Sequence, residues 1–265
     1  MSDTDTIHHA RPLAPWVGGK HHLACRLVRR IEAIPHRLYA EPFIGMAGVF
    51  LRRSRPAPAE AINDRSQEVV TLFRVVRHHP EALLSEMRFQ LASRAEFSRL
   101  LRVPADTLTD IQRAARFLTL QRLVYGGKPG ATSFPARRSQ PRSFDAAALR
   151  RTVEALHDRL ARVTIECLDY QEFIRRYDHA GALFYLDPPY YLCEDYYGKG
   201  LFSRSDFERL ADLLGSIKGR WLMSINDHPE IRRLFGRFRI DEEPVSYRVG
   251  GAVKPVVELV ISGGG

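Results

Sequence analysis

The fold of this chain of 265 residues is decided by residues 182–190, which read Ala-Leu-Phe-Tyr-Leu-Asp-Pro-Pro-Tyr. Five uncharged, mostly apolar residues predict a strand. The two prolines end the strand, because proline fixes φ and has no N–H to donate. The chain must then turn, and it presents Asp187, the Pro188 carbonyl and the Tyr190 ring together. In an open α/β sheet, this carboxyl edge is where ligands bind.

Strands and helices alternate on both sides of this stretch, which predicts an α/β protein with a mostly parallel sheet. Near the C-terminus, residues 238–249 and 256–261 flank the pair Gly250-Gly251. This pattern predicts an antiparallel pair that closes one edge of the sheet. The other strands are expected at Leu38–Glu41, Glu60–Asp64, Val163–Cys167 and Trp221–Ile225, and the helices at Gln67–Val76, Tyr170–Tyr177 and Arg204–Lys218.

A glycine turn follows the first expected strand, where residues 41–48 read Glu-Pro-Phe-Ile-Gly-Met-Ala-Gly, and a helix is expected from Val49. Glycines let the backbone approach a nucleoside closely, and an acid at a strand end can bind a cationic or hydroxyl group. Asp64 follows Gly45 by 19 residues, close to the interval at which a ribose-binding acid follows a nucleotide-binding turn. The pattern is not G-x-G-x-x-G, which argues against a dinucleotide.

Residues 16–20 read Trp-Val-Gly-Gly-Lys, a glycine pair between an aromatic residue and a cation. A helix is expected to begin near His21. The segment can contribute to a binding site, and taken alone it is equally compatible with a flexible turn or a helix cap.

Residues 66–150 form a helical, arginine-rich region that differs from the rest in charge. The region has 14 Lys and Arg against 7 Asp and Glu, so it carries +7 of the net charge of +9. An inserted basic subdomain is the natural interpretation. Within it, residues 124–138 mix turn residues, aromatic rings and basic groups, which is typical of a nucleic-acid contact and also of a surface loop. Basic residues there and just beyond are candidate DNA contacts: Lys128, Arg137, Arg138 and Arg142.

The composition excludes several classes of protein. A hydrophobic content of 45% and a charged content of 27% are ordinary for a globular chain, and they exclude full disorder. No apolar run approaches the ~20 residues that cross a bilayer. Arginine makes up 35 of the 40 basic residues, and a pI near 9.7 fits a polyanionic partner, although a GC-rich genome would also enrich arginine.

The N-terminal residues, the cysteines and the histidines indicate the compartment of the protein and whether it has disulfide bonds or a metal site. The first five residues are acidic in character and no apolar segment follows, so a cytoplasmic protein is expected. Three cysteines are odd in number and form no CxxC pair, so they are expected to be buried, small apolar residues. The histidine pairs stand on adjacent residues, without the i,i+4 spacing of a helical metal site, so no metal is expected.

The order of these segments resembles that of the bacterial and phage DNA adenine N6-methyltransferases with alpha-type motif order. In that family a WxGGK segment, an EPFxGxG segment, a basic target-recognition insertion and a DPPY box follow one another, and the resemblance extends over about residues 12–262. It implies a class I S-adenosylmethionine-dependent methyltransferase fold, Rossmann-like, with an inserted, mostly helical subdomain. The catalytic domain would comprise residues 1–65 and 151–265, and the target-recognition insertion residues 66–150.

Residue roles follow from the matched positions. The resemblance implies that Asp187, Pro188, Pro189 and Tyr190 hold the target base. The residues implied for S-adenosylmethionine are Trp16, Lys20, Glu41, Pro42, Phe43, Gly45, Asp64, Asp169, Tyr170 and Asp187.

The implied reaction is site-specific methylation of N6 on an adenine flipped out of duplex DNA, without a metal. Relatives that recognise GATC usually carry Asn-Gly and Phe-Asn-Val-Pro in the hairpin, whereas residues 126–129 and 133–135 here read Gly-Gly-Lys-Pro and Ser-Phe-Pro, so GATC is not predicted. A monomer is expected, and a cognate restriction endonuclease is a candidate partner.

Other functions stay open on the sequence. Methylation of N4 of cytosine uses the same amine geometry. A silent DNA-binding regulator of the same fold would have no need of the carboxylate Asp187, and RNA or a protein amide as substrate would leave the basic insertion less well explained.

Overall fold

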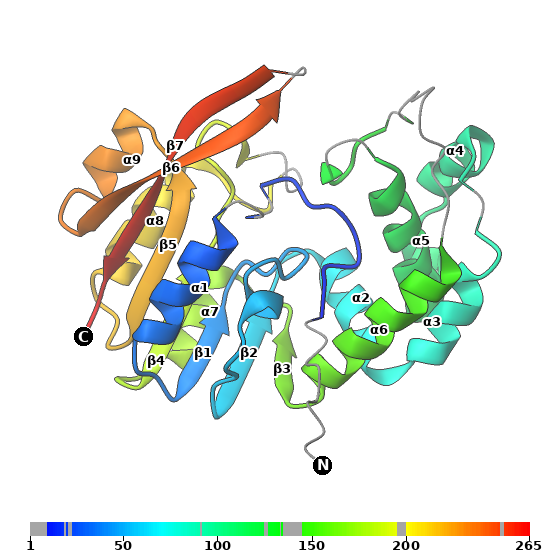
Figure 1. The fold of residues 1–265 in the computed structure, drawn as a ribbon, viewed down its shortest axis with the longest axis horizontal. Helices are drawn as coiled ribbons and strands as arrows, with labels where there is room; N and C mark the ends of the chain where they lie inside the picture. The colour runs from blue at the N-terminus through cyan, green and yellow to red at the C-terminus, as the bar shows by residue number, and fades with distance from the viewer. Residues whose placement is uncertain are drawn as a thin grey trace, which may run out of the picture.

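The computed structural model describes residues 10–18, 20, 23–90, 92–124, 127–132, 134, 145–194, 200–249 and 252–265. A seven-stranded mixed sheet in the order β3-β2-β1-β4-β5-β7-β6 forms its centre (Figure 1). The first five strands in this order are parallel, and β7 is antiparallel to both of its neighbours. The strands are β1 Leu38–Glu41, β2 Ala59–Asn63, β3 Val163–Glu166, β4 Ala182–Leu186, β5 Arg220–Asn226, β6 Arg239–Val249 and β7 Ala252–Gly263.

Helices cover both faces of the sheet, and a helical group stands beside its β3 edge (Figure 1). In the described part of the chain the α-helices are α1 Ala24–Ala33, α2 Gln67–His78, α3 Pro80–Met87, α4 Arg94–Arg102, α5 Asp110–Leu123, α6 Ala146–Leu160, α7 Tyr170–Tyr177, α8 Arg204–Leu214 and α9 Pro229–Leu234. None of them is long and apolar enough to cross a membrane.

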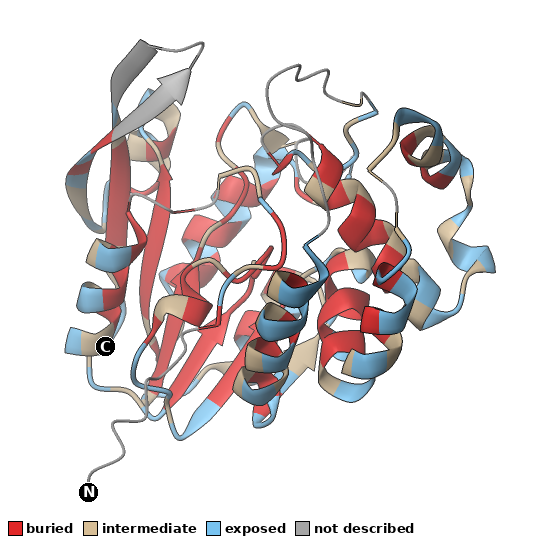
Figure 2. Cartoon of the chain, turned by 45° about the vertical axis from the view of Figure 1, so that its right-hand side comes forward, coloured by how far each residue is buried: buried red, intermediate tan, exposed pale blue. Residues whose placement is uncertain are grey.

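Strand residues alternate between two hydrophobic cores, because successive side chains of a strand point to opposite faces. Leu183 and Tyr185 of β4 pack in the core beneath α1, whereas Phe184 and Leu186 pack in the core with α7 and α8. All five residues of β4 are buried, as expected for a central parallel strand. The central strands are accordingly largely red in Figure 2, and the outer faces of the helices are largely pale blue or tan.

The helical group α2–α6 lies between β2 and β3 in the sequence, and it shares the first core with the sheet. Val69 and Leu72 of α2 belong to the same buried cluster as Ile62 of β2 and Leu183 of β4. Local signals set the ends of these helices: Thr109 and Gln112 form a capping box at the start of α5. Helix α6 runs without a break to Leu160.

Strand order places the ligand edge between β1 and β4. The chain moves outward from β1 to β2 and β3 on one side, and from β4 to β5 on the other. Adjacent strands whose connections run in opposite directions leave a crevice at their carboxyl ends. Glu41 ends β1 and Asp187 follows β4, so the two carboxylates stand at this crevice.

Several bounds differ by a few residues from the sequence expectations, and three differences stand out. The segment after the glycine turn is a single 3-10 turn, Phe50–Arg52, in place of a full helix. Helix α8 ends at Leu214, because Gly215 caps it with bonds to the carbonyls of the last turn. Cys25 and Cys167 are exposed and Cys193 is half-buried, so the expectation of buried cysteines was wrong. Cys25 lies on α1 where the helix lines the cavity, and Cys167 lies in the loop after β3, so neither side chain packs in a core.

Candidate active site

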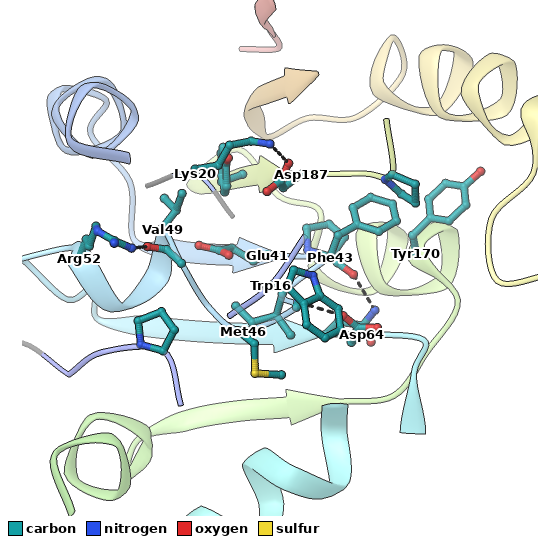
Figure 3. Close-up of a pocket in the computed structure, with 18 of the residues that line it drawn as sticks. Trp16, Lys20, Glu41, Phe43, Met46, Val49, Arg52, Asp64, Tyr170 and Asp187 are labelled. Atoms are coloured by element: carbon teal, nitrogen blue, oxygen red, sulfur yellow. Dashed lines mark hydrogen bonds and ion pairs between the residues drawn. The ribbon is translucent and has the colours of Figure 1, made fainter. Parts of the chain in front are cut away.

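A cavity of about 1060 Å³ opens at the carboxyl ends of the parallel strands (Figure 3). It is lined by residues from the ends of four neighbouring strands, together with the N-terminal segment. The lining includes most of the residues predicted for the cofactor: Trp16, Lys20, Glu41, Pro42, Phe43, Gly45, Asp64, Tyr170 and Asp187. Pro189 of the proline turn also lines it. Segments far apart in the sequence therefore meet in one place, as the motif order had indicated.

Lys20 is the buried cation of the site. Its ammonium lies 2.7 Å from Asp187 Oδ1 and donates to Tyr190 Oη at 2.8 Å and to the Gly18 carbonyl at 3.1 Å. Glu258 Oε2 of β7 lies 3.8 Å away, and the lysine side chain is only 1% exposed. The N-terminal lysine thus connects both ends of the proline turn, and it holds a carboxylate and an aromatic ring in fixed positions.

Asp187 is half-buried, with 20% of its side chain exposed toward the cavity. Burial raises the pKa of this carboxyl to about 6, and the attraction of Lys20 opposes the shift without cancelling it. At neutral pH Asp187 is therefore a carboxylate, which accepts hydrogen bonds and stabilises positive charge. Because Asp187 lines the cavity, it can accept a hydrogen bond from a substrate amine there.

The turn after Asp187 is held from the neighbouring strand. Asn226 at the end of β5 accepts from the Tyr191 N–H at 2.9 Å and donates to the Tyr191 carbonyl at 3.3 Å. The next residue, Leu192, has φ of +71°, where side chains other than glycine are strained. Leu192 is also 58% exposed. The chain therefore leaves the site through a strained, outward-facing residue.

Glu41 ends β1 with a fully buried carboxyl group that faces the cavity (Figure 3). Burial raises its pKa to about 8, and the hydrogen bond from Tyr39 and the charge of Arg53 only partly oppose this shift. Tyr39 Oη donates to Glu41 Oε1 at 2.6 Å. Glu41 is thus largely protonated at neutral pH, and a cationic ligand beside it would favour its ionised form.

The glycine turn is braced by Asp64. Its Oδ2 accepts from the Gly45 N–H at 3.0 Å, and its Oδ1 accepts from the Ser66 N–H at 2.9 Å. Gly45 has φ of +48°, and a Cβ at this position would lie 2.5 Å from Trp16 Nε1. Only glycine allows the indole of Trp16 to pack on the turn. Burial raises the pKa of Asp64 to about 6.

Three aromatic rings form one wall of the cavity. The Phe43 centroid lies 5.5 Å from that of Tyr170 and 5.8 Å from that of Phe202. The hydroxyl of Tyr170 points away and donates to Asp206 Oδ1 at 3.0 Å. The wall therefore presents ring faces and edges, which suits a flat heterocycle.

Asp169 takes a different position from the one predicted. It lies outside the described lining of the cavity, where its Oδ1 accepts from the Gln171 N–H as the cap of α7. Its Oδ2 pairs with exposed Arg65 at 2.8 Å. The contact with Gln171 is that of a helix cap, because a short polar residue before a helix satisfies its first N–H groups.

Several residues that line the cavity were not predicted from the sequence. Asn63 donates to the Pro42 and Leu168 carbonyls at 3.0 and 3.1 Å, and it accepts from the Leu168 N–H at 2.8 Å, so it connects the loops after three strands. Its place at the end of β2, one residue before Asp64, was the only available signal. Others missed were Tyr185, Leu168, Leu201, Phe202, Met46 and Arg52.

The insertion contacts the N-terminal segment directly. Gly127 O accepts from the Val17 N–H at 3.0 Å and from Gln121 Nε2 of α5 at 2.6 Å, and Gln121 also bonds the Pro15 carbonyl. Lys128 follows on the surface and is exposed. The other predicted DNA contacts, Arg137, Arg138 and Arg142, lie outside the described residues.

Comparison with known proteins points to one family. The model of the D12 class N6 adenine-specific DNA methyltransferase family matches residues 16–248. A DNA adenine methylase of Serratia marcescens is 28% identical over 236 residues, which cover 82% of this chain and 83% of that protein. A type II methyltransferase of Lactococcus lactis subsp. cremoris is 26% identical over 254 residues, covering 87% and 86%. Another, of Paramecium bursaria Chlorella virus NC1A, is 24% identical over 246 residues, covering 90% and 91%.

Proposed function

The chain belongs to the D12 class of N6 adenine-specific DNA methyltransferases, and on that premise we propose which of its residues carry the reaction. Enzymes of this class transfer a methyl group from S-adenosylmethionine to N6 of adenine in DNA, so adenine N6 is the acceptor and cytosine N4 is not. The mixed sheet of this chain, in which five parallel strands are followed by an antiparallel pair, fits the class I methyltransferase fold. The single observation that carries the residue assignment is the meeting of Lys20, Asp187 and Tyr190 at the cavity.

The residues around the cavity fit S-adenosylmethionine. Gly45 brings backbone to the cavity surface, Glu41 turns a carboxyl group into it, and the ring of Phe43 offers a wall for a purine. When bound, the cofactor supplies a methyl group made electrophilic by a positively charged sulfur. We assign Glu41 to its α-ammonium group and Phe43, Asp64 and Tyr170 to its adenosine.

The proline turn is the site for the target adenine. Adenine N6 is a poor nucleophile because its lone pair delocalises into the ring. The Asp187 carboxylate and the Pro188 carbonyl each accept a hydrogen bond from the N6 amine. These bonds localise the lone pair and stabilise the positive charge that develops on nitrogen. Lys20 favours the ionised form of Asp187 and holds its carboxylate in place. The ring of Tyr190 stacks on the base. Positioning and electrostatics supply the acceleration.

Residues 66–150, which include helices α2–α5, are proposed as the target-recognition part, which binds duplex DNA while the adenine is flipped out. Support comes from the net charge of +7 over residues 66–150 and from the bond between Gly127 and Val17 beside the cavity. Flipping costs a few kcal/mol, which stacking on Tyr190 offsets in part. Because two relatives are type II methyltransferases, a restriction endonuclease of the same specificity is a proposed partner.

We propose that the chain acts as a monomer in the compartment that holds the DNA. The test of the assignment uses a methylation-deficient host that expresses the wild type, Asp187→Ala or the control Asp212→Ala. Asp212 lies on α8 and is 74% exposed. Plasmid DNA is digested for mass spectrometry and also sequenced with modification detection on each strand. N6-methyladenine in one short context is expected from the wild type and the control. Methylation by Asp187→Ala would overturn the assignment.

A further inference from the structure

We propose that Tyr39 is a positioning residue for the cofactor, which orients Glu41 so that one carboxylate oxygen is reserved for the α-ammonium group of S-adenosylmethionine. The inference rests on the proposed role of Glu41. It adds a buried hydroxyl that neither the motif order nor the lining of the cavity identifies. Tyr39 acts through Glu41 and does not itself touch the cofactor.

The first support is the geometry of the pair. Tyr39 and Glu41 are two apart on β1, so their side chains leave the same face of the strand. Tyr39 Oη donates to Glu41 Oε1 at 2.6 Å, and both side chains are buried. Among the described residues, Oε2 of Glu41 has no hydrogen-bond partner, while Glu41 lines the cavity (Figure 3). One oxygen is thus committed to the protein and the other faces the ligand.

The second support is the way in which the ring of Tyr39 is held. The guanidinium carbon of Arg53 lies 3.6 Å from its centroid, and Phe50 stacks on it at 6.4 Å with an interplanar angle of 27°. Arg53 is itself fixed, because it donates to Glu60 Oε1 at 2.6 Å and its side chain is fully buried. With its ring confined in this way, Tyr39 keeps its hydroxyl at Glu41.

The charges around Glu41 give this hydrogen bond a measurable effect. Burial raises the pKa of Glu41 to about 8, the bond from Tyr39 and the charge of Arg53 lower it, and the charges of Asp187 and Glu60 raise it. These side chains face Glu41 from its own strand, from β2 and β4, and from the turn after β1. Loss of the Tyr39 hydroxyl therefore raises the pKa further, so a higher pH is needed before Glu41 can bind an ammonium group.

The test is Tyr39→Phe, which keeps the ring and its stacking and removes only the hydroxyl. We expect the Kd for S-adenosylmethionine at pH 7.5 to rise about tenfold, as for the loss of one hydrogen bond to a charged group. The Kd should recover toward the wild-type value as pH rises, and kcat at saturating cofactor should change less than twofold. Titration calorimetry between pH 6.5 and 9 measures the first two, and steady-state kinetics the third.

The matched control is Tyr177→Phe. Tyr177 donates to Glu166 Oε1 at 2.9 Å on α7, outside the described lining of the cavity. It also loses one bond from a tyrosine to a glutamate, so both variants should show similar unfolding midpoints, and the Kd of the control should equal that of the wild type. A cofactor analogue without the α-amino group should bind the wild type and Tyr39→Phe equally.

Glu41→Gln distinguishes the role of Glu41 in binding the cofactor from the role of Tyr39 in positioning Glu41. If Glu41→Gln binds the cofactor as tightly as the wild type, the proposed role of Glu41 fails. If Glu41→Gln binds weakly while Tyr39→Phe binds like the wild type at every pH, the positioning role of Tyr39 is overturned and that of Glu41 stands. The double variant should bind no more weakly than Glu41→Gln alone, because Tyr39 acts only through Glu41.

Discussion

Lys20 Nζ lies 2.7 Å from Asp187 Oδ1, so a lysine that precedes the first helix neutralises the carboxylate that follows the fourth strand. A buried charge left without a partner is strongly unfavourable, which ties the N-terminal segment to the proline turn. Glu258, 3.8 Å from the same ammonium, adds a second negative charge from β7. The N-terminal segment, the proline turn and β7 therefore share one electrostatic centre at Lys20.

The pH dependence of catalysis should report Asp187. Burial raises its pKa to about 6, and the carboxylate is the form that accepts hydrogens from the adenine amine. At saturating cofactor, kcat/KM for DNA should be flat above this value and fall about tenfold for each pH unit below it. Methylation assays from pH 5 to 8 measure this limb. A profile that stays flat down to pH 5 would contradict the assignment.

Lys20→Met should shift the acid fall in kcat/KM to higher pH. Without the ammonium, the burial of Asp187 and the charge of Glu258 both raise its pKa and nothing from Lys20 opposes them. Activity at pH 7.5 should therefore fall by at least about tenfold and recover in part at higher pH. A uniform loss of activity at every pH would show that Lys20 contributes otherwise than through the charge of Asp187.

Stability should also respond to Glu41. Its pKa is about 8 in the folded protein against an ordinary 4.5, so between these values the folded chain binds more protons than the unfolded chain. The free energy of unfolding therefore falls as pH rises, by up to about 1.4 kcal/mol per pH unit. His36 has the opposite effect near 6.5, because burial lowers its pKa. Urea unfolding of the wild type and Glu41→Gln between pH 6.5 and 8 measures how the free energy of unfolding changes with pH. The decrease with pH should be absent in Glu41→Gln.

Glu60 is expected to be a major contributor to stability. It accepts from Arg53 at 2.6 Å and from Arg159 of α6 at 3.0 Å, and the side chains of both arginines are buried or nearly so. Glu60→Gln leaves these charges without a carboxylate and should lower the free energy of unfolding by about 3–5 kcal/mol. Glu230→Gln, which breaks an exposed pair with Arg233, should lower the free energy of unfolding far less, because water screens that pair. Equal effects in urea unfolding would contradict this view.

Cofactor binding should protect Cys25 from modification. The thiol is exposed and lines the cavity, whereas Cys167 is exposed outside the described lining. Saturating S-adenosylmethionine should slow maleimide labelling of Cys25 and leave that of Cys167 unchanged, as peptide mass spectrometry can measure. Equal protection of both thiols would point to a global change in place of direct cover.

Much of the fold was predictable because its signals are local. The bounds of β1, β4 and α7 match the predictions, since buried apolar runs, the proline pair and the cap Asp169 act over a few residues. The antiparallel pair around Gly250-Gly251 was also confirmed. The helix expected after the glycine turn shrank to one 3-10 turn, which apolar periodicity alone could not reveal.

By itself, the sequence determined the family, the α/β class and the side chains at strand ends, because each depends on residue types at short spacing. Only the tertiary structure decided which of these side chains meet. Lys20 and Asp187 are 167 residues apart, and they touch because β1 pairs with β4 and brings both segments to one edge. The tertiary structure also decides the hydrogen bond between Leu168 and Asn63 and the packing of Arg53 on the ring of Tyr39. Such contacts depend on strand order and packing, which no short stretch of sequence contains.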